Sequence, residues 1–156
     1  MKFRSLVTAA LVVAAAAPAF AAGPLTMTTR MMVEKRVAAA DGSTTTSLVP
    51  AVSVAPGDRI TVVLAYRNTG TAALGDLVLA NPVPKNVAYR GAATTAAPEV
   101  SVDGKTFGTL AALRVTTPAG TMRPATADDV THVRWRLSSP VSAGQGGELA
   151  FKAVLK

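Results

Sequence analysis

The clearest structural signal in the chain lies in residues 131–156, which read THVRWRLSSPVSAGQGGELAFKAVLK. Two rows of apolar residues occupy alternate positions on either side of the glycine-rich stretch Gly144–Gly147: Val133, Trp135, Leu137 and Leu149, Phe151, Ala153, Leu155. Successive side chains of a β-strand point to opposite faces of a sheet. The period of two therefore predicts two half-buried strands separated by a turn.

The same alternation recurs toward the N-terminus. Leu25 to Val37 has apolar residues at most odd positions and predicts one long strand. Asp41-Gly42 predicts a turn, followed by a strand from Thr44 to about Val54. Further strands are expected at Ile60 to Tyr66, Leu77 to Ala80, Val87 to Arg90 and on both sides of Asp103-Gly104. Residues 109–129, rich in threonine, alanine and proline, are expected to form a long loop that could contain one short strand.

The first residues have the layout of a secretory signal peptide. Lys2 and Arg4 precede an uncharged run from Leu6 to Ala17, and Pro18 is followed by Ala19-Phe20-Ala21. As a helix this run would rise only about 18 Å, which is too short for a hydrocarbon core of about 30 Å. We expect cleavage after Ala21 and export to the periplasm, the cell surface or the medium, with no transmembrane segment in the mature chain.

The expected fold class is all-β. About seven to nine strands, separated by turns at roughly ten-residue intervals, favour an immunoglobulin-like antiparallel β-sandwich. Trp135 is expected at the centre of its core, with Tyr66 and Phe151. The chain divides into a signal peptide (1–21), an N-terminal strand segment (22–55) and the sandwich domain (56–156).

The order of turn and core motifs resembles a known family. The motifs are Pro56-Gly57-Asp58, Tyr66, Asn68-Thr69-Gly70, Asn81-Pro82-Val83-Pro84, Val87 with Tyr89, Asp103-Gly104, Val133-Arg134-Trp135 and Leu149-Ala150-Phe151. Together they resemble the conserved-repeat domain of unknown function of bacterial and archaeal surface proteins, over about the last hundred residues. The resemblance implies an immunoglobulin-type sandwich with a structural or adhesive role, and it brings no catalytic residues.

The chain departs from that family in two motifs and in copy number. Asn81 stands where the family usually has aspartate, and Ala143-Gly144-Gln145 stands where Pro-Gly-Glu is usual. A single copy makes a passive spacer role less natural than in the tandem arrays of the family.

Residues that could carry catalysis or bind a metal are few. Cysteine is absent, which excludes disulfides, thiolate zinc sites and a cysteine nucleophile. His132, the single histidine, is expected on an exposed face without partners for a triad or metal site. The adjacent Asp128 and Asp129 lack the pattern of a helical calcium loop. We therefore expect a non-enzymatic protein without cofactor or metal.

Basic residues suggest a partner of opposite charge. Arg134 and Arg136 are expected to face outward on one strand, and Lys152 and Lys156 on the next. If these strands are neighbours, the four cations form one face that would attract an anionic glycan, lipid or lipopolysaccharide. The alternative is that these residues keep sheet faces soluble. Nucleic acid is disfavoured by export.

The first long strand offers a second kind of contact. Its apolar face consists of Leu25, Met27, Met31, Val33 and Val37. This face can complete the sheet of its own chain, or it can act as a donor strand between copies or with other envelope proteins. The sequence thus leads to two functional hypotheses: an exported structural or adhesive envelope module that self-associates by strand addition, and a binding module for an anionic glycan or lipid.

Overall fold

The computed structural model describes residues 23–38 and 40–156, so the expected signal peptide (1–21) lies outside the described residues. The described residues form ten strands and two single turns of 3₁₀ helix, η1 (Leu110–Ala112) and η2 (Ala127–Asp129). The strands are β1 (Leu25–Ala38), β2 (Thr44–Pro50), β3 (Arg59–Asn68), β4 (Val78–Pro82), β5 (Val87–Ala92), β6 (Glu99–Ser101), β7 (Arg114–Thr116), β8 (Met122–Pro124), β9 (His132–Arg136) and β10 (Gly146–Leu155). The all-β prediction is confirmed.

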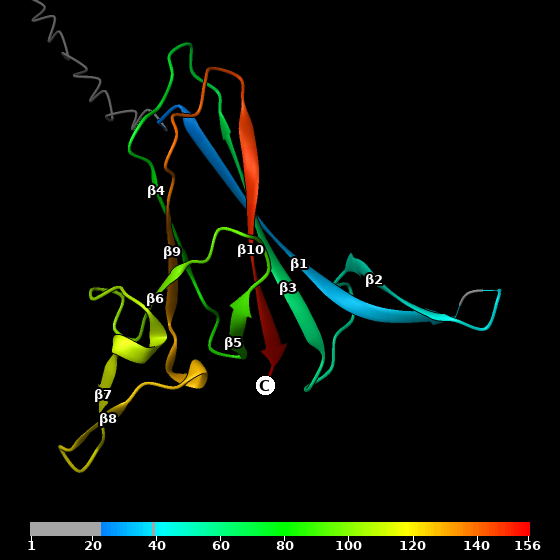
Figure 1. The fold of residues 1–156 in the computed structure, drawn as a ribbon, viewed down its shortest axis with the longest axis vertical. Coiled ribbons are helices and arrows are strands. Elements are labelled where there is room, and N and C mark those ends of the chain that lie inside the picture. Colours follow the sequence, from blue (N-terminus) through cyan, green and yellow to red (C-terminus); the bar gives the residue numbers. More distant parts are fainter. Residues whose placement is uncertain (1–22, 39) are drawn as a thin grey trace, which may run out of the picture.

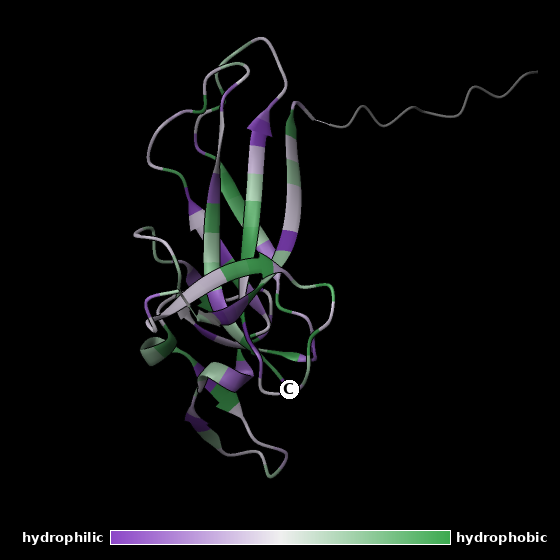
Figure 2. Ribbon diagram, turned by 90° about the vertical axis from the view of Figure 1, so that its right-hand side faces the viewer, coloured by the Kyte–Doolittle hydropathy of each residue, from purple (hydrophilic) through white to green (hydrophobic). Residues whose placement is uncertain are grey.

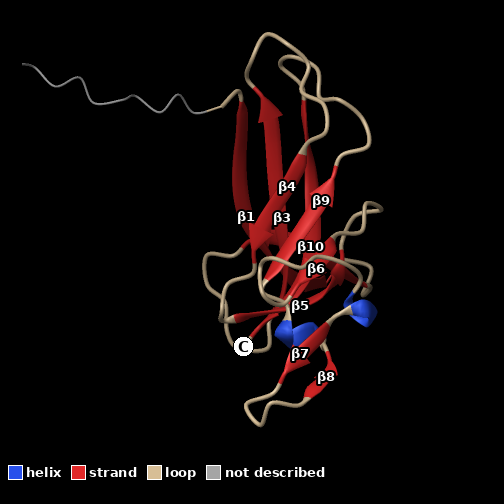
Figure 3. Cartoon of the chain, turned by 90° about the vertical axis from the view of Figure 1, so that its left-hand side faces the viewer, coloured by secondary structure: helices blue, strands red, loops and turns tan. Residues whose placement is uncertain are grey.

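Two antiparallel sheets form the body of the molecule. The larger has the strand order β2-β1-β3-β10-β5, and the smaller has the order β4-β9-β6 (Figure 1, Figure 3). The sheets pack against each other through apolar side chains, as in a β-sandwich. Trp135 of β9 meets Phe151 of β10 across this interface, with ring centroids 6.4 Å apart.

The alternation in the sequence explains which side chains reach the core. Ile60, Val62 and Leu64 of β3 face inward, and Leu149, Phe151 and Ala153 lie beside them on β10. Leu79, Val133 and Trp135 close the core from the smaller sheet. Figure 2 shows the resulting bands of apolar and polar residues along the strands.

The aromatic core differs from the prediction in one residue. Trp135 and Phe151 are buried as expected, but Tyr66 is only half-buried. Tyr89 of β5 is the buried tyrosine, with its ring centroid 5.9 Å from that of Phe151. Burial raises the pKa of the Tyr89 hydroxyl above its usual value.

Two segments contain more or less structure than the sequence predicted. The strand expected to reach about Val54 ends at Pro50, because its pairing with β1 ends at Met32. The segment 109–129 contains both 3₁₀ turns and the β7–β8 hairpin, which brings the strand number above the expected seven to nine. A capping box between Thr126 and Asp129 fixes the second turn, and the carboxylate of Asp129 also binds Arg123.

The expected N-terminal segment 22–55 is part of the larger sheet. β1 pairs with β3 from Leu25 to Val33 and with β2 from Met32 to Ala38. Beyond Val33, β1 therefore leaves β3 and continues with β2 as a two-stranded arm (Figure 1).

Candidate functional site

The predicted basic face is not formed, because its two strands belong to different sheets. β9 lies in the smaller sheet and β10 in the larger one. Trp135 and Phe151 face each other across the core, so their strand neighbours Arg134 and Lys152 point outward from opposite sides of the molecule. Arg134 and Arg136 are thus separated from Lys152 and Lys156, and the expectation of one four-cation surface was wrong.

On the smaller sheet the two arginines are already engaged within the chain. Glu99 of β6 lies opposite Arg134, and its Oε2 accepts hydrogen bonds from Arg134 Nε (2.9 Å) and Nη2 (2.6 Å). Arg136 Nε is 3.6 Å from the same oxygen, and the Arg134 guanidinium lies 4.1 Å above the ring of Phe107. The hydrogen bond from Arg134 lowers the pKa of Glu99. This surface offers little free positive charge to a partner.

The other candidate residues have partners within the chain. His132 Nδ1 is 3.0 Å from Thr131 Oγ1, and its ring packs against the turn at Gly104. Asp128 binds Arg90 at 2.8 Å. Hydrogen bonds from Arg123 hold the pKa of Asp129 well below its usual range. The described residues contain no group of three or more side chains suited to hold a metal ion.

The five residues of the predicted self-association face on β1 differ in how far they are buried. Val33 is buried and Leu25 packs against the core, because both lie on the inner face of the sheet of their own chain. Met27 and Met31 lie on the same inner face but remain 44% and 38% exposed. The side chain of Val37 lies outside the described part of the chain. β1 therefore completes its own sheet, and among the residues of this face whose side chains the structure describes, the two methionines remain free to contact a partner.

The first half of β1 nevertheless has an open edge. β3 covers one side of Leu25–Met31, and no described strand pairs with the other side, because β2 begins its pairing at Met32. In an antiparallel ladder the N–H and C=O of one residue point to the same side, and this side alternates along the strand. The Met31 carbonyl accepts from Ala51 N–H (3.0 Å) on the β2 side, and the Pro24 carbonyl accepts from Thr69 N–H (2.6 Å) on the β3 side. The backbone groups of Leu25, Met27 and Thr29 consequently face the open edge.

The outer edge of β2 lies on the two-stranded arm and ends at Pro50, and the remaining edges of the two sheets are interrupted or covered. β5 carries a bulge at Arg90-Gly91, β4 ends at Pro82, and β6 is bridged by Gly108. Bulges, prolines and covering segments protect sheet edges from pairing with other chains. Leu25–Thr29 lacks all of these features and contains no charged residue. We therefore regard it as the candidate interaction site.

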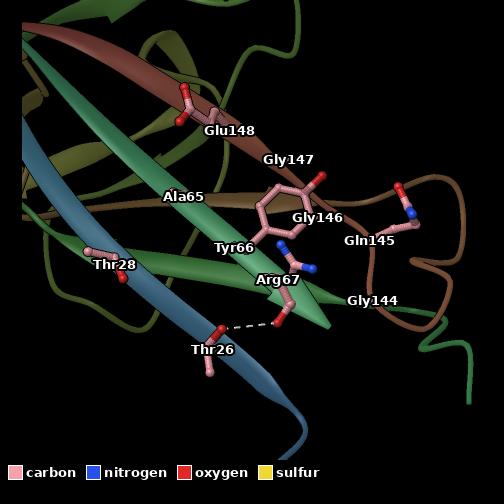
Figure 4. A pocket seen from close by; sticks show the side chains of 10 residues that line it. All are labelled: Thr26, Thr28, Ala65, Tyr66, Arg67, Gly144, Gln145, Gly146, Gly147 and Glu148. Carbon is pink, nitrogen blue, oxygen red and sulfur yellow. Dashed lines mark hydrogen bonds between the residues drawn. The ribbon is translucent and has the colours of Figure 1, made fainter. Parts of the chain in front are cut away.

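A polar depression of about 650 Å³ lies on the outer face of the larger sheet beside this edge (Figure 4). Thr26 and Thr28 of β1, Arg67 of β3 and Glu148 of β10 line it around the small side chain of Ala65. The Thr26 hydroxyl donates to the Arg67 carbonyl (3.2 Å), and Glu148 forms an ion pair with Arg30. Glu148, held in this ion pair, is the one acidic residue among the described residues that line the depression.

The glycines beside this depression allow two chain segments to approach closely. A Cβ on Gly146 would lie 2.1 Å from the Tyr66 carbonyl oxygen, and one on Gly147 would lie 2.6 Å from the Tyr66 hydroxyl. The sequence predicted a turn here, and Gly144 supplies it with φ of +73°. The close approach of Gly146 and Gly147 to Tyr66 could not be read from the turn signal alone.

Comparison with known proteins adds no relative. The chain matches no known family, no curated protein and no solved structure. Among the described residues, no helix has the length and apolar character needed to cross a bilayer. The resemblance to the conserved-repeat domain therefore stays a prediction.

Proposed function

We propose that this protein is an exported, non-enzymatic structural or adhesive module of the cell envelope. In this proposal it is an immunoglobulin-like sandwich of the conserved-repeat kind, and copies associate by adding strands at the open edge of β1. The observation that carries the proposal is the unprotected edge Leu25–Thr29, whose outward N–H and C=O groups have no partner among the described residues.

A second copy of the same edge fits these groups. Two antiparallel β1 strands related by a two-fold axis at Met27 would pair Met27 with its symmetry mate and Leu25 with Thr29. All three residues direct their backbone groups toward the open edge, as a hydrogen-bonded pair requires. Pairing that reached Met31 would compete with the hydrogen bond from Ala51, which limits the added ladder to Leu25–Thr29.

The expected association is weak. Leu25 is already packed on the core, so the apolar gain comes from the exposed part of Met27, and backbone hydrogen bonds supply the rest. Fully burying a methionine stabilises by about 1.5–3 kcal/mol, and Met27 is less than half exposed. A transient dimer that strengthens at high local concentration, as on a crowded envelope, agrees with these magnitudes.

Proline at neighbouring positions tests the edge directly. Met27→Pro removes an N–H that faces the open edge, so it abolishes dimerisation while preserving the fold. Thr28→Pro removes an N–H that faces β3, so it lowers the melting temperature instead. Sedimentation equilibrium over a wide concentration range measures association, and circular dichroism measures the melting temperature.

Three results would contradict the proposal. The edge is not used if the unaltered protein stays monomeric at all concentrations or if Met27→Pro associates as the unaltered protein does. A hydrolytic or redox activity that disappears in His132→Ala, with the fold intact, would contradict the non-enzymatic part.

A further inference from the structure

A second depression, of about 400 Å³, lies on the outer face of the larger sheet, away from the open edge of β1. Side chains of four strands surround it: Glu34 of β1, Arg59 of β3, Arg90 of β5 and Lys152 of β10. Of these, only Lys152 belonged to the basic face expected from the sequence. Strand pairing in the larger sheet gives it different cationic neighbours.

The register of the sheet brings Arg59 and Lys152 together. Lys152 pairs with Thr61, and Val154 pairs with Arg59, so Arg59 and Lys152 are diagonal neighbours on one face. Diagonal side chains on paired strands lie about 7–8 Å apart, within reach of long residues. A ligand between them can contact both cations.

A β-bulge brings in the third cation. Lys152 pairs with Gly91 and Ala153 pairs with Tyr89, which leaves Arg90 as the extra residue of β5. Gly91 has φ of +114°, a conformation that favours glycine, and no atom beyond its two chain neighbours lies within 4 Å of the Cβ position at this residue. The bulge therefore directs Arg90 toward the depression and leaves open space beside Lys152.

The charges of the depression are unevenly compensated. Arg90 Nη1 donates to Asp128 Oδ1 (2.8 Å) and to the Tyr89 carbonyl (2.9 Å), which fixes the direction of its guanidinium. Arg59 and Lys152 form no ion pair with any residue that the structure describes. Glu34 adds one carboxylate to the lining, also without an ion pair to a described residue. The site thus presents two free cations, one oriented arginine and one hydrogen-bond acceptor.

We propose that this depression binds one anionic sugar unit of an envelope glycan. The phosphate or carboxylate group lies between Lys152 and Arg59, with Arg90 as a further donor. Glu34 accepts a hydrogen bond from a sugar hydroxyl.

The same residues disfavour polyanions that lack sugar hydroxyls at this position. The Glu34 carboxylate would repel their negative groups, because like charges in contact are unfavourable. No aromatic side chain lines the depression, so the stacking that single-stranded nucleic acids require is absent there. Its volume lies within the range of small-ligand sites of about 300–1,000 Å³.

Titration of the protein with defined small probes tests this site. Glucuronic acid and glucose 6-phosphate represent the two kinds of anionic group, and glucose and inorganic phosphate are the controls. Chemical shift changes in NMR spectra report both affinity and position. We expect at least one anionic sugar to bind more tightly than either control and to shift the amides around Gly91 and Lys152.

Substitutions locate the binding. Lys152→Gln and Arg59→Gln are each expected to weaken the anionic sugar about tenfold, as the loss of one charge-assisted hydrogen bond does. Arg136→Gln, which removes an exposed cation from the other sheet, serves as the matched control and leaves the affinity unchanged. Glu34→Gln should strengthen inorganic phosphate relative to the sugar.

The site is overturned if no anionic sugar binds, if Lys152→Gln and Arg59→Gln bind as the unaltered protein does, or if Arg136→Gln causes an equal loss. Inorganic phosphate that binds as tightly as the anionic sugars would overturn the assignment to a glycan. None of these results depends on dimerisation, because the depression lies away from the edge that the Met27→Pro experiment tests.

Discussion

The two sheets use the same alternation of apolar and polar residues but expose very different surfaces. In the smaller sheet, Trp135 and its apolar neighbours fill the core on the inner face. On the outer face, the carboxylate of Glu99 compensates the charges of Arg134 and Arg136. The larger sheet is wider than the layer that covers it. It therefore retains exposed methionines, an open edge and two cations without an acidic partner among the described residues.

This difference shows how a sandwich can separate stability from binding. The smaller sheet covers the core, and the charges on its outer face are paired within the chain. Substitutions in this sheet should therefore mainly change the free energy of unfolding. The wider layer contributes to the same core through β3 and β10 and also carries both surfaces that we propose for partners. Substitutions in the smaller sheet should consequently change stability without changing binding, whereas substitutions in the larger sheet can change stability, binding or both.

Trp135→Ala should have the largest effect on stability. The indole is 3% exposed, contacts Phe151 of the other sheet and donates from Nε1 to the Ala96 carbonyl (2.9 Å). Its loss leaves a cavity between the sheets, and we expect a destabilisation of about 3–5 kcal/mol. Denaturant unfolding measures this change. Arg136→Ala, one residue away but directed outward, should change the midpoint very little, and an unchanged midpoint for Trp135→Ala would contradict the placement of the core.

Most of the fold could be predicted from alternation, because that pattern reports which side chains are buried. The apolar rows of β3, β9 and β10 all reach the core. The hairpin β7–β8 was missed, because each of its strands has only three residues and none of them is buried. Alternation also favoured Tyr66 over Tyr89, since a period of two cannot show where the covering sheet ends.

The binding surfaces could not be predicted, because they depend on which strands are neighbours. β9 and β10 follow each other in the chain, and the four-cation face was predicted on the condition that they are neighbours in one sheet. The connection 137–145 is longer than hairpin loops of about two to five residues, a signal that could have separated the two strands. Gly91 within an otherwise regular strand was a sign of the bulge that presents Arg90.

Asn68→Ala should have an intermediate effect, at the upper end of the larger sheet. Asn68 is fully buried, and its Nδ2 donates to the carbonyls of Ala72 (2.8 Å) and Val141 (2.9 Å). Its Oδ1 accepts from Gly70 N–H (2.9 Å). Loss of buried hydrogen-bond partners costs about 1–3 kcal/mol. Thermal unfolding measures it, and Asn68→Asp should cost more than Asn68→Ala, because a carboxylate would then face two carbonyl oxygens. Equal stability of the unaltered protein, Asn68→Ala and Asn68→Asp would show that these side-chain hydrogen bonds do not stabilise the fold.

Phe107→Leu should have the smallest effect on stability. It tests the paired charges on the outer face of the smaller sheet. The Arg134 guanidinium lies 4.1 Å from the Phe107 ring centroid, while Glu99 fixes it from the side. Leucine keeps an apolar contact with the arginine stem but removes the ring, so the expected loss is the cation–π contribution of about 0.5–1 kcal/mol. A double-mutant cycle with Arg134→Gln separates this contribution from the loss of apolar area. In the Arg134→Gln background, Phe107→Leu should cost less, because the guanidinium that interacts with the ring is gone. If Phe107→Leu costs the same with Gln at position 134 as with Arg, the ring only fills space. If Phe107→Leu lowers the free energy of unfolding more than Asn68→Ala does, the outer face of the smaller sheet contributes more to stability than predicted.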